Sequence, residues 1–286
     1  MEIHHYTRAS TLPLILGTRT IRFTRADLLD DASEVPIKNQ HIDARYFYVS
    51  SWTLQSNEQS GQWHRYGDAS RGVRISFHES PFEWENVSVL IRREVAGDPG
   101  EDHLEDVRSV GIRVDGVDVP YPSSSMFGNG YILIPDGSGT RREFGCAVTY
   151  VDNVELEAAK YCISDNGKTT IYGSASNVAR IKASAWADQE EYRYVLMAVA
   201  GPEKTYVESP SVYEAELLDS IESRGVVPFP PAKVGHIDIP LSLDAFEKMT
   251  VTLGPLISRE DTEKVLEALK LLAPKASIKF SAINLR

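Results

Sequence analysis

The chain has 286 residues, of which 42% are hydrophobic and 25% charged, and this composition excludes general disorder. Its 41 acidic residues outnumber 30 basic ones, and the formal net charge of −11 argues against nonspecific binding to nucleic acid or anionic lipid. Two cysteines, Cys146 and Cys162, are too few for a disulfide-stabilised secreted scaffold and lack the spacing of a zinc site.

The N-terminus and the apolar segments indicate the compartment. No basic start followed by an apolar stretch is visible, so no signal peptide is expected. The longest apolar runs, such as 195–200, have about a third of the length that a membrane-spanning helix needs. The sequence therefore predicts a soluble, cytoplasmic protein without a membrane partner.

The N-terminal part of the chain alternates strands with short helices. Alternation and β-branched residues predict the strands, and Ser10 or Thr11 with Gly17 brackets a short helix. A polar loop carrying Asp27, Asp30, Asp31 and Glu34 follows the second strand. The expected elements are strands at 2–8, 18–24, 45–50 and 72–77, with helices at 11–16 and 57–66.

The pattern from 87 to 150 is almost entirely β, and the rest of the chain is mixed. Turn residues such as Asp115-Gly116 separate strands at 87–94, 106–114, 130–134 and 143–150. The expected later elements are helices at 170–184, 211–223 and 259–272 and strands at 191–199, 234–239, 250–253 and 277–281. Runs of strands with helices between some of them predict an α+β fold, and no linker divides the chain. We therefore expect one domain over 1–286, with a β-rich insertion at about 86–142.

Motifs for metals and phosphates are absent from the sequence. His4 and His5 are neighbours on a predicted strand, so their side chains point to opposite faces and do not easily share one metal ion. The glycines at 128–130 and 137–139 sit between strands, whereas a phosphate-binding loop leads from a strand into a helix. We expect hairpin turns there, and no metal site.

Three stretches carry residues suited to ligand binding. Ser51-Trp52 places a hydroxyl and a flat ring at a strand end, and Trp63 and Tyr66 share one helical face at i and i+3. Alternation puts Gln189, Glu191 and Arg193 on one face of a buried strand, where polar groups are costly unless they are paired or functional. Core packing of the aromatic rings and a structural Glu191–Arg193 ion pair are the alternatives.

Together these stretches resemble an uncharacterised bacterial domain-of-unknown-function family, found in many genomes and often near mobile elements. The loop 29–34 keeps the family's second Asp and its Glu, as Asp31 and Glu34, but lacks its Asn and Pro. The region at about 86–142 lies outside the resemblance. The matching segments are His5-Tyr6-Thr7, Ser51-Trp52-Thr53, Trp63 to Tyr66, 72–77, Lys182 with Trp186, Gln189, Glu191 and Arg193, Gly254-Pro255, and 281–286.

That family in turn is similar to the ADP-ribosyltransferase superfamily, which implies a split mixed β core with helices and an antiparallel β insertion. The resemblance implies Glu191 as the catalytic carboxylate, Gln189 as the residue that orients the acceptor, and His5 as the ribose anchor. It implies no metal, and NAD as the co-substrate. The implied cofactor-binding residues are His5, Tyr6, Ser51, Trp52, Trp63 and Tyr66, with Trp52 and Tyr66 stacking on nicotinamide and Ser51 on its amide.

The function that these resemblances imply is an NAD-dependent ADP-ribosyltransferase or NAD glycohydrolase of toxin or anti-phage defence type. Its macromolecular acceptor is not encoded in any motif. The alternative is a catalytically silent sensor or interaction module that retains the fold and uses the 86–142 insertion as a partner surface. A third alternative is a hydrolase acting on a nucleotide or a modified RNA end.

Overall fold

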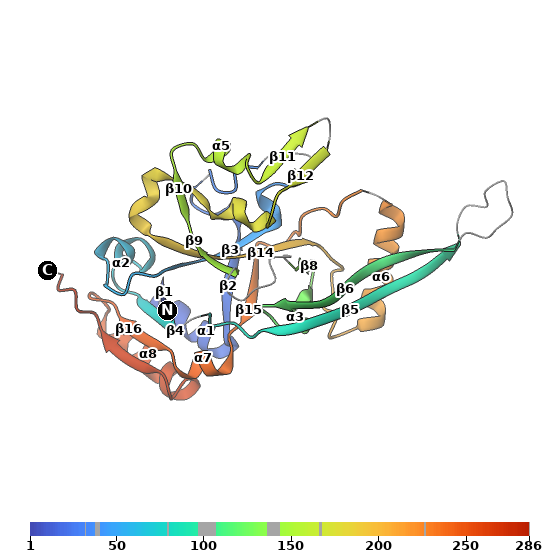
Figure 1. Ribbon diagram of the computed structural model, residues 1–286. Helices are drawn as coiled ribbons and strands as arrows, with labels where there is room; N and C mark the ends of the chain where they lie inside the picture. Colours follow the sequence, from blue (N-terminus) through green and yellow to red (C-terminus); the bar gives the residue numbers. More distant parts are fainter. Residues whose placement is uncertain are drawn as a thin grey trace.

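A large mixed sheet forms the centre of the protein (Figure 1). The computed structural model describes residues 1–31, 33–37, 41–78, 80–96, 107–135, 144–165, 168–225 and 227–285. Within these ranges the sheet has eleven strands, and its neighbours are antiparallel except for the parallel pair of β16 and β17. The main path runs β17 (Ser277–Phe280), β16 (Thr250–Leu253), β4 (Val73–His78), β1 (Glu2–Thr7), β3 (Phe47–Thr53), β14 (Glu191–Ala200), β8 (Tyr131–Ile134) and β7 (Phe127–Gly128).

The sheet splits along one edge of β3. On its other edge, β3 pairs with β14 over seven residues, from Thr53 opposite Glu191 to Phe47 opposite Met197. On the split edge, β1 pairs with the end of β3 through His4, opposite Thr53. β2 (Thr20–Arg25) pairs with β3 near the start of that strand. The other edge of β2 pairs with β15 (His236–Pro240). The middle of this edge, around Ser51, therefore has no neighbouring strand in the described chain.

Helices cover the sheet where their apolar positions recur at helical spacing. In α8 (Arg259–Leu272), Val265 and Leu269 are buried at i and i+4, and the Ser258 side chain caps the first turn by accepting from the Asp261 N–H. This helix packs against α1 (Leu12–Thr18), and α2 (Ser60–Tyr66) lies beside β1. The contact between α2 and β1 brings this helix next to the first strand of the sheet.

Two smaller regions flank the large sheet. β5 (Glu85–Ala96) and β6 (Val107–Val119) form a long antiparallel hairpin that extends away from the body, and α6 (Pro210–Arg224) packs against it part-way along its length, near Arg93 (Figure 1). α3 (Ser123–Met126) and α7 (Leu243–Glu247) are short helices, and β9 (Gly145–Ala147) pairs with β14. The remaining part holds β10 (Thr149–Val151) with β13 (Ile181–Ala183), β11 (Cys162–Asp165) with β12 (Lys168–Ile171), α5 (Val154–Ala158) and the 3-10 turns η4 (Ala175–Arg180) and η5 (Ser184–Gln189).

The α+β class predicted from the sequence is confirmed, and the helix predicted over 170–184 is wrong. The β-branched run Thr169, Thr170 and Ile171 pairs with β11 instead, and Gly173, at a φ of 69°, ends that strand in the left-handed region. The glycines at 128–130 form the turn between β7 and β8, as predicted. The expected turn at 137–139 and the segments 97–106 and 136–142 of the insertion lie outside the described residues.

The strands predicted between 86 and 142 do not share one sheet. Within the described ranges, the two strands of the β5–β6 hairpin pair only with each other, while β8 joins the large sheet beside the C-terminal half of β14. In the described part of the chain, no helix has the length and apolar character needed to cross a membrane.

Candidate functional site

A small pocket lies where β1 and β3 separate. Its volume is about 100 Å³. An engineered apolar cavity of about 150 Å³ holds one benzene molecule, so a pocket of this size suits a single ring or a few waters. Four parts of the chain line it, namely β1, β3, α2 and the junction of η5 with β14, through His4, His5, Tyr6, Ser51, Trp52, Thr53, Gln62, Tyr66, Gln189 and Glu191.

All but one of the site residues expected from the sequence line this pocket. The exception is Trp63, which is fully buried, packs edge-on against Tyr6 with ring centroids 4.8 Å apart, and donates its indole N–H to Glu58 Oε2 at 2.8 Å. Tyr66, one turn later on α2, is 40% exposed and lies at the pocket. Although Trp63 and Tyr66 are three residues apart on α2, the first lies in the core and the second at the pocket. The expectation that Trp63 lines the site is therefore wrong, and Trp63 is a core residue.

Trp52 contributes to both the core and the pocket. Its side chain is 3% exposed, and its ring lies 5.0 Å from His5, 5.8 Å from Phe77 and 6.1 Å from Tyr194, measured between centroids. The indole N–H donates to Ser50 Oγ at 3.0 Å. Because these contacts fix the ring from several sides, Trp52 offers the pocket a rigid wall.

The two histidines of β1 are both neutral at neutral pH. His5 Nδ1 lies 3.0 Å from the Ser51 carbonyl oxygen, which can only accept, so Nδ1 carries the proton and Nε2 is an acceptor. Burial lowers the pKa of His5, and burial together with the Arg74 charge lowers the pKa of His4 to about 4. His4 Nδ1 is 2.7 Å from Ser76 Oγ, and among the described residues its buried Nε2 has no hydrogen-bond partner.

Behind the pocket, Glu191 belongs to a buried cluster of four charges, which also contains Glu34, Lys182 and Arg193. Arg193 donates from Nε to Glu191 Oε1 at 2.6 Å and from Nη1 to Glu34 Oε2 at 2.5 Å. Lys182 Nζ lies 3.1 Å from Glu191 Oε2 and 3.2 Å from Glu34 Oε1. The Glu191–Arg193 pair expected from the sequence is thus present, as one side of a cluster whose two negative and two positive charges balance.

This cluster keeps Glu191 ionised. Burial alone would raise the pKa of its carboxyl group, but the charge and hydrogen bonds of Arg193, followed by the charge of Lys182, lower that pKa to about 2. The backbone N–H of Glu191 also donates to the Tyr150 hydroxyl at 2.9 Å. Burial, and then the charge of Glu191, raise the pKa of Tyr66 to about 12, so its phenol stays protonated. The pocket therefore presents one fixed carboxylate beside neutral groups.

Gln189 is held with its NH₂ group unpartnered. Its Oε1 accepts from Lys182 Nζ at 2.9 Å, and its backbone carbonyl accepts from Gln62 Nε2 at 2.7 Å. An ammonium group can only donate, so Lys182 fixes the orientation of the amide. The side chain is 2% exposed, and its Nε2 finds no acceptor among the described residues. A buried donor without a partner is costly, and a bound ligand with an acceptor would relieve that cost.

Five residues of this region are not among the site residues expected from the sequence, although the sequence leaves His4 as an open alternative to His5. His4, Thr53 and Gln62 line the pocket, Lys182 pairs with Glu191, and Glu34 pairs with Lys182 and Arg193. Strand alternation could have found Thr53, because it lies directly opposite Glu191 and next to His4. Glu34 lies 159 positions from its partner Arg193, a pairing that no local pattern encodes.

Comparisons with protein-family models, with curated proteins and with solved structures give no match for this chain. In the part of the chain that the structure describes, no three His, Cys, Asp or Glu side chains come together as a metal site. The function is therefore inferred from the pocket itself.

Proposed function

We propose that this protein is an NAD-dependent ADP-ribosyltransferase, or an NAD glycohydrolase, built on an ADP-ribosyltransferase-like split sheet and acting as a toxin or in anti-phage defence. The observation that carries the proposal is the meeting of Glu191, His5, Trp52 and Tyr66 at one ring-sized pocket, beside the split edge of β3. An ionised carboxylate can stabilise the cationic sugar that NAD cleavage forms, and aromatic rings can pack on the nicotinamide.

The reaction breaks the bond between the nicotinamide nitrogen and the ribose carbon. The bonding electron pair leaves with neutral nicotinamide, positive charge develops on the ribose, and water or an acceptor group then bonds to that carbon and loses a proton. A carboxylate fixed beside the sugar stabilises the developing charge without reorganising. Glu191 suits this role because its pKa of about 2 keeps it negative throughout the neutral range.

The other residues at the pocket suit NAD in the following way. His5 Nε2 accepts from a ribose hydroxyl, since Nδ1 is occupied by the Ser51 carbonyl. The nicotinamide ring packs between Trp52 and Tyr66, with Tyr6 behind it and Ser51 at the carboxamide. The free NH₂ group of Gln189 donates to an oxygen of the substrate or the acceptor. The small volume fits the nicotinamide end, while the rest of NAD lies outside.

One observation favours a second candidate, a catalytically silent sensor or interaction module. Both carboxylate oxygens of Glu191 are engaged by Arg193 and Lys182, which is what a purely structural ion cluster would require. The long β5–β6 hairpin would then serve as the partner surface.

The test is nicotinamide release from NAD by three proteins: the wild type, Glu191→Gln and the matched control Glu34→Gln. Each substitution removes one negative charge from the same cluster, but only Glu191 lines the pocket. Breaking a buried pair costs on the order of 3–5 kcal/mol, so both variants should lose similar stability. We expect Glu191→Gln to lower the rate per folded molecule by about a hundredfold or more, and Glu34→Gln to change it by only a few fold.

Two results would contradict the enzyme proposal. Equal loss of rate in both variants would make Glu191 a structural residue. If the wild type released no nicotinamide with water, with the protein's own side chains or with bacterial lysate as the acceptor, the interaction module would become the better proposal.

A further inference from the structure

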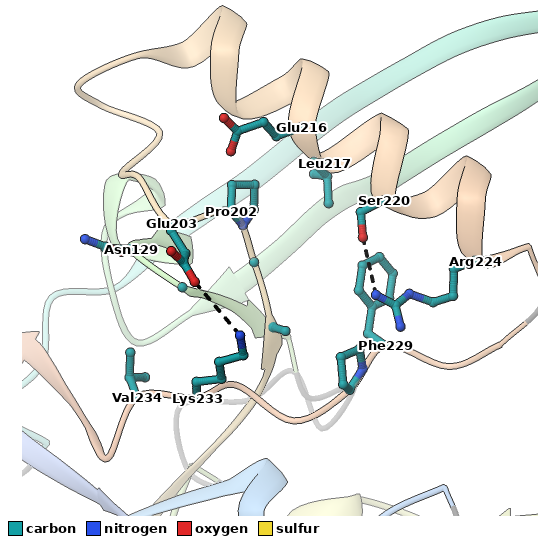
Figure 2. Close-up of a pocket in the computed structure, with 14 residues that line it drawn as sticks. Asn129, Pro202, Glu203, Glu216, Leu217, Ser220, Arg224, Phe229, Lys233 and Val234 are labelled. Atoms are coloured by element: carbon teal, nitrogen blue, oxygen red, sulfur yellow. Dashed lines mark hydrogen bonds and ion pairs between the residues drawn. The ribbon is translucent and has the colours of Figure 1, made fainter.

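A second, larger cavity lies at the other end of β14. Its volume is about 670 Å³, within the range of small-molecule sites. The first cavity touches Glu191 at the start of β14, and this one touches Ala200 at its end. Nine residue steps along a strand span about 30 Å, so the two cavities are separate sites. Figure 2 shows α6 forming one wall, with Ser220 and Arg224 projecting from it toward Phe229.

Main-chain hydrogen bonds hold the other walls in place. The segment before β15 is tied to β14 by the Ala200 N–H donating to the Pro230 carbonyl at 2.8 Å. The turn before β8 is tied to the chain after β14 by the Gly130 N–H donating to the Pro202 carbonyl at 2.7 Å. The cavity is therefore formed without a ligand.

Most charged side chains at this cavity are paired with each other. Lys233 lies 3.9 Å from Glu203, on the opposite side of the cavity from Arg224 (Figure 2). Glu216 accepts from Lys204 at 3.3 Å. These pairs leave no net charge, so the character of the site depends on Arg224.

Among the described residues, the guanidinium of Arg224 has no ion-pair partner. Its guanidinium carbon lies 5.2 Å from the centre of the Phe229 ring, and Nη2 donates to Ser220 Oγ at 3.3 Å. Its Nε is buried and finds no acceptor in the described part of the chain. The stacked ring holds the planar group still, which is the arrangement that binds carboxylates and phosphates through two parallel hydrogen bonds.

Apart from Asn129, the remaining side chains of the lining are apolar. Leu217 lines the cavity from α6, and Pro202, Pro230 and Val234 line it from the other segments. Arg224 and Pro230 also line a neighbouring cavity of about 650 Å³, in which Arg45 is already paired with Asp43. Among the described residues, Arg224 is thus the cation without an ion-pair partner at both cavities. The cavity with the larger apolar lining is the one that contains Leu217.

We propose that this cavity binds a small organic anion, with a carboxylate or phosphate on Arg224 and an apolar ring against Leu217, Pro202 and Val234. The protein carries a net charge of −11, so anions are repelled from its surface in general, and binding here would require this built site. The proposal does not depend on the proposed function.

The test is titration of the full-length protein, followed by NMR, with phenyl phosphate and with benzoate, which separate the two anionic groups. Inorganic phosphate supplies the anionic group alone, and benzyl alcohol supplies the ring alone. We expect at least one ring-bearing anion to bind tenfold or more tighter than either half, with shifts confined to α6 and 227–234. Arg224→Gln should weaken that binding about tenfold or more, because it removes a charge-assisted hydrogen bond. The matched control Lys233→Gln removes an exposed, paired cation from the same cavity and should change binding by less than twofold.

Arg224→Lys guards against a folding defect, because it keeps the charge and loses the planar pair of donors. Intermediate binding by Arg224→Lys supports the proposal. Three results would overturn it: no binding of either ring-bearing anion by the wild type at millimolar concentration, unchanged binding by Arg224→Gln, or equal weakening by Lys233→Gln.

Discussion

The four charges behind the pocket cancel in pairs, and this balance decides how single substitutions there behave. Removing Glu34, Lys182, Glu191 or Arg193 alone leaves one buried charge without compensation. A loss of activity in such a variant can then come from unfolding. Substitutions that remove one charge of each sign keep the cluster neutral, and they separate positioning from stability.

The double variant Lys182→Met, Glu34→Gln tests whether Lys182 orients Gln189. It leaves Glu191 paired with Arg193 and removes the only donor that Gln189 Oε1 has among the described residues. We expect the side-chain NH₂ resonances of Gln189 to shift and to exchange faster with solvent than in the wild type, because the amide can now rotate. NMR of the free protein measures this without any substrate.

Glu34→Gln alone is the control for that experiment, since it keeps Lys182 on Gln189. If the Gln189 resonances are the same in all three proteins, packing alone orients the amide, and Lys182 has no positioning role.

The buried His4 should make the protein less stable in mild acid. The pKa of its imidazole is about 4 in the folded protein against an ordinary 6.5, so the unfolded chain binds a proton that the folded one does not. The free energy of unfolding should therefore fall as the pH drops from about 6.5 toward 4, by on the order of 2–3 kcal/mol, with no contribution above 6.5.

Urea titrations of the wild type and His4→Asn at pH 7.5, 6 and 5 check this. The fall should be smaller in His4→Asn, whereas His64→Asn, which removes an exposed imidazole from α2, should follow the wild type. Glu191 does not interfere, because its stabilisation is lost only as the pH falls from about 4.5 toward 2. Parallel curves for the wild type and His4→Asn would show that His4 does not cause the acid sensitivity.

At the scale of elements, the junction between η5 and β14 turns the chain into the pocket. Glu190 lies there at φ 42° and ψ 52°, in the left-handed region, directly between Gln189 and Glu191. Its carbonyl accepts from Thr53 Oγ1 at 3.2 Å, which ties the turn to β3. The backbone strain is thus placed beside the two residues that the candidate site depends on most.

The effect of a substitution at Glu190 on the free energy of unfolding should depend on how readily the new residue adopts the left-handed conformation. Glycine adopts it without a steric penalty, so Glu190→Gly should keep or raise the free energy of unfolding, by up to about 1 kcal/mol. A β-branched residue fits it poorly, so Glu190→Val should lower that energy by about 1–2 kcal/mol. Thermal unfolding measures both, and a less stable Glu190→Gly would mean that the glutamate side chain itself stabilises the turn.

The elements that the sequence predicted well are those with strict alternation or strong caps. The strands at β1, β4 and β14 and the helix α8 were predicted within a few residues, because burial repeats along them. The helix predicted over 170–184 is wrong because the apolar residues of this segment also suit short 3-10 turns. Gly173 favours the turns over the helix. The order His5, Ser51-Trp52, Gln189 and Glu191 predicted the pocket, whereas Lys182 and Glu34 act through contacts that only folding creates.

At the scale of the whole molecule, β14 links two cavities of different character. Its first residue, Glu191, carries a fixed negative charge, and its last residue, Ala200, lies at the cavity that holds the guanidinium of Arg224. A buried strand between them is a rigid spacer rather than a hinge. The β5–β6 hairpin packs near Arg93 against α6, the helix that forms a wall of the second cavity.

The arrangement of the hairpin predicts that its outer part can be removed without loss of the large sheet. Arg93 pairs with Val110, so deleting 94–109 and joining these partners through Asn-Gly leaves a two-residue hairpin turn. The shortened hairpin keeps the buried Ile91 and the ion pair of Arg93 with Asp219 at 2.6 Å. We expect the melting temperature to change by less than about 3 °C, since a two-stranded arm adds little stability of its own.

Two substitutions on β5 calibrate this result. Ile91→Ala empties a buried site and should cost about 2–5 kcal/mol, whereas Leu90→Ala, at a position 59% exposed, should cost little. NMR signals from β1, β3 and β14 should be unchanged in the shortened protein. If those signals shift, or if the melting temperature falls as far as it does in Ile91→Ala, the outer hairpin is part of the same cooperative unit as the candidate site. In that case the stability of the pocket depends on the outer hairpin, and the hairpin belongs to the core of the fold.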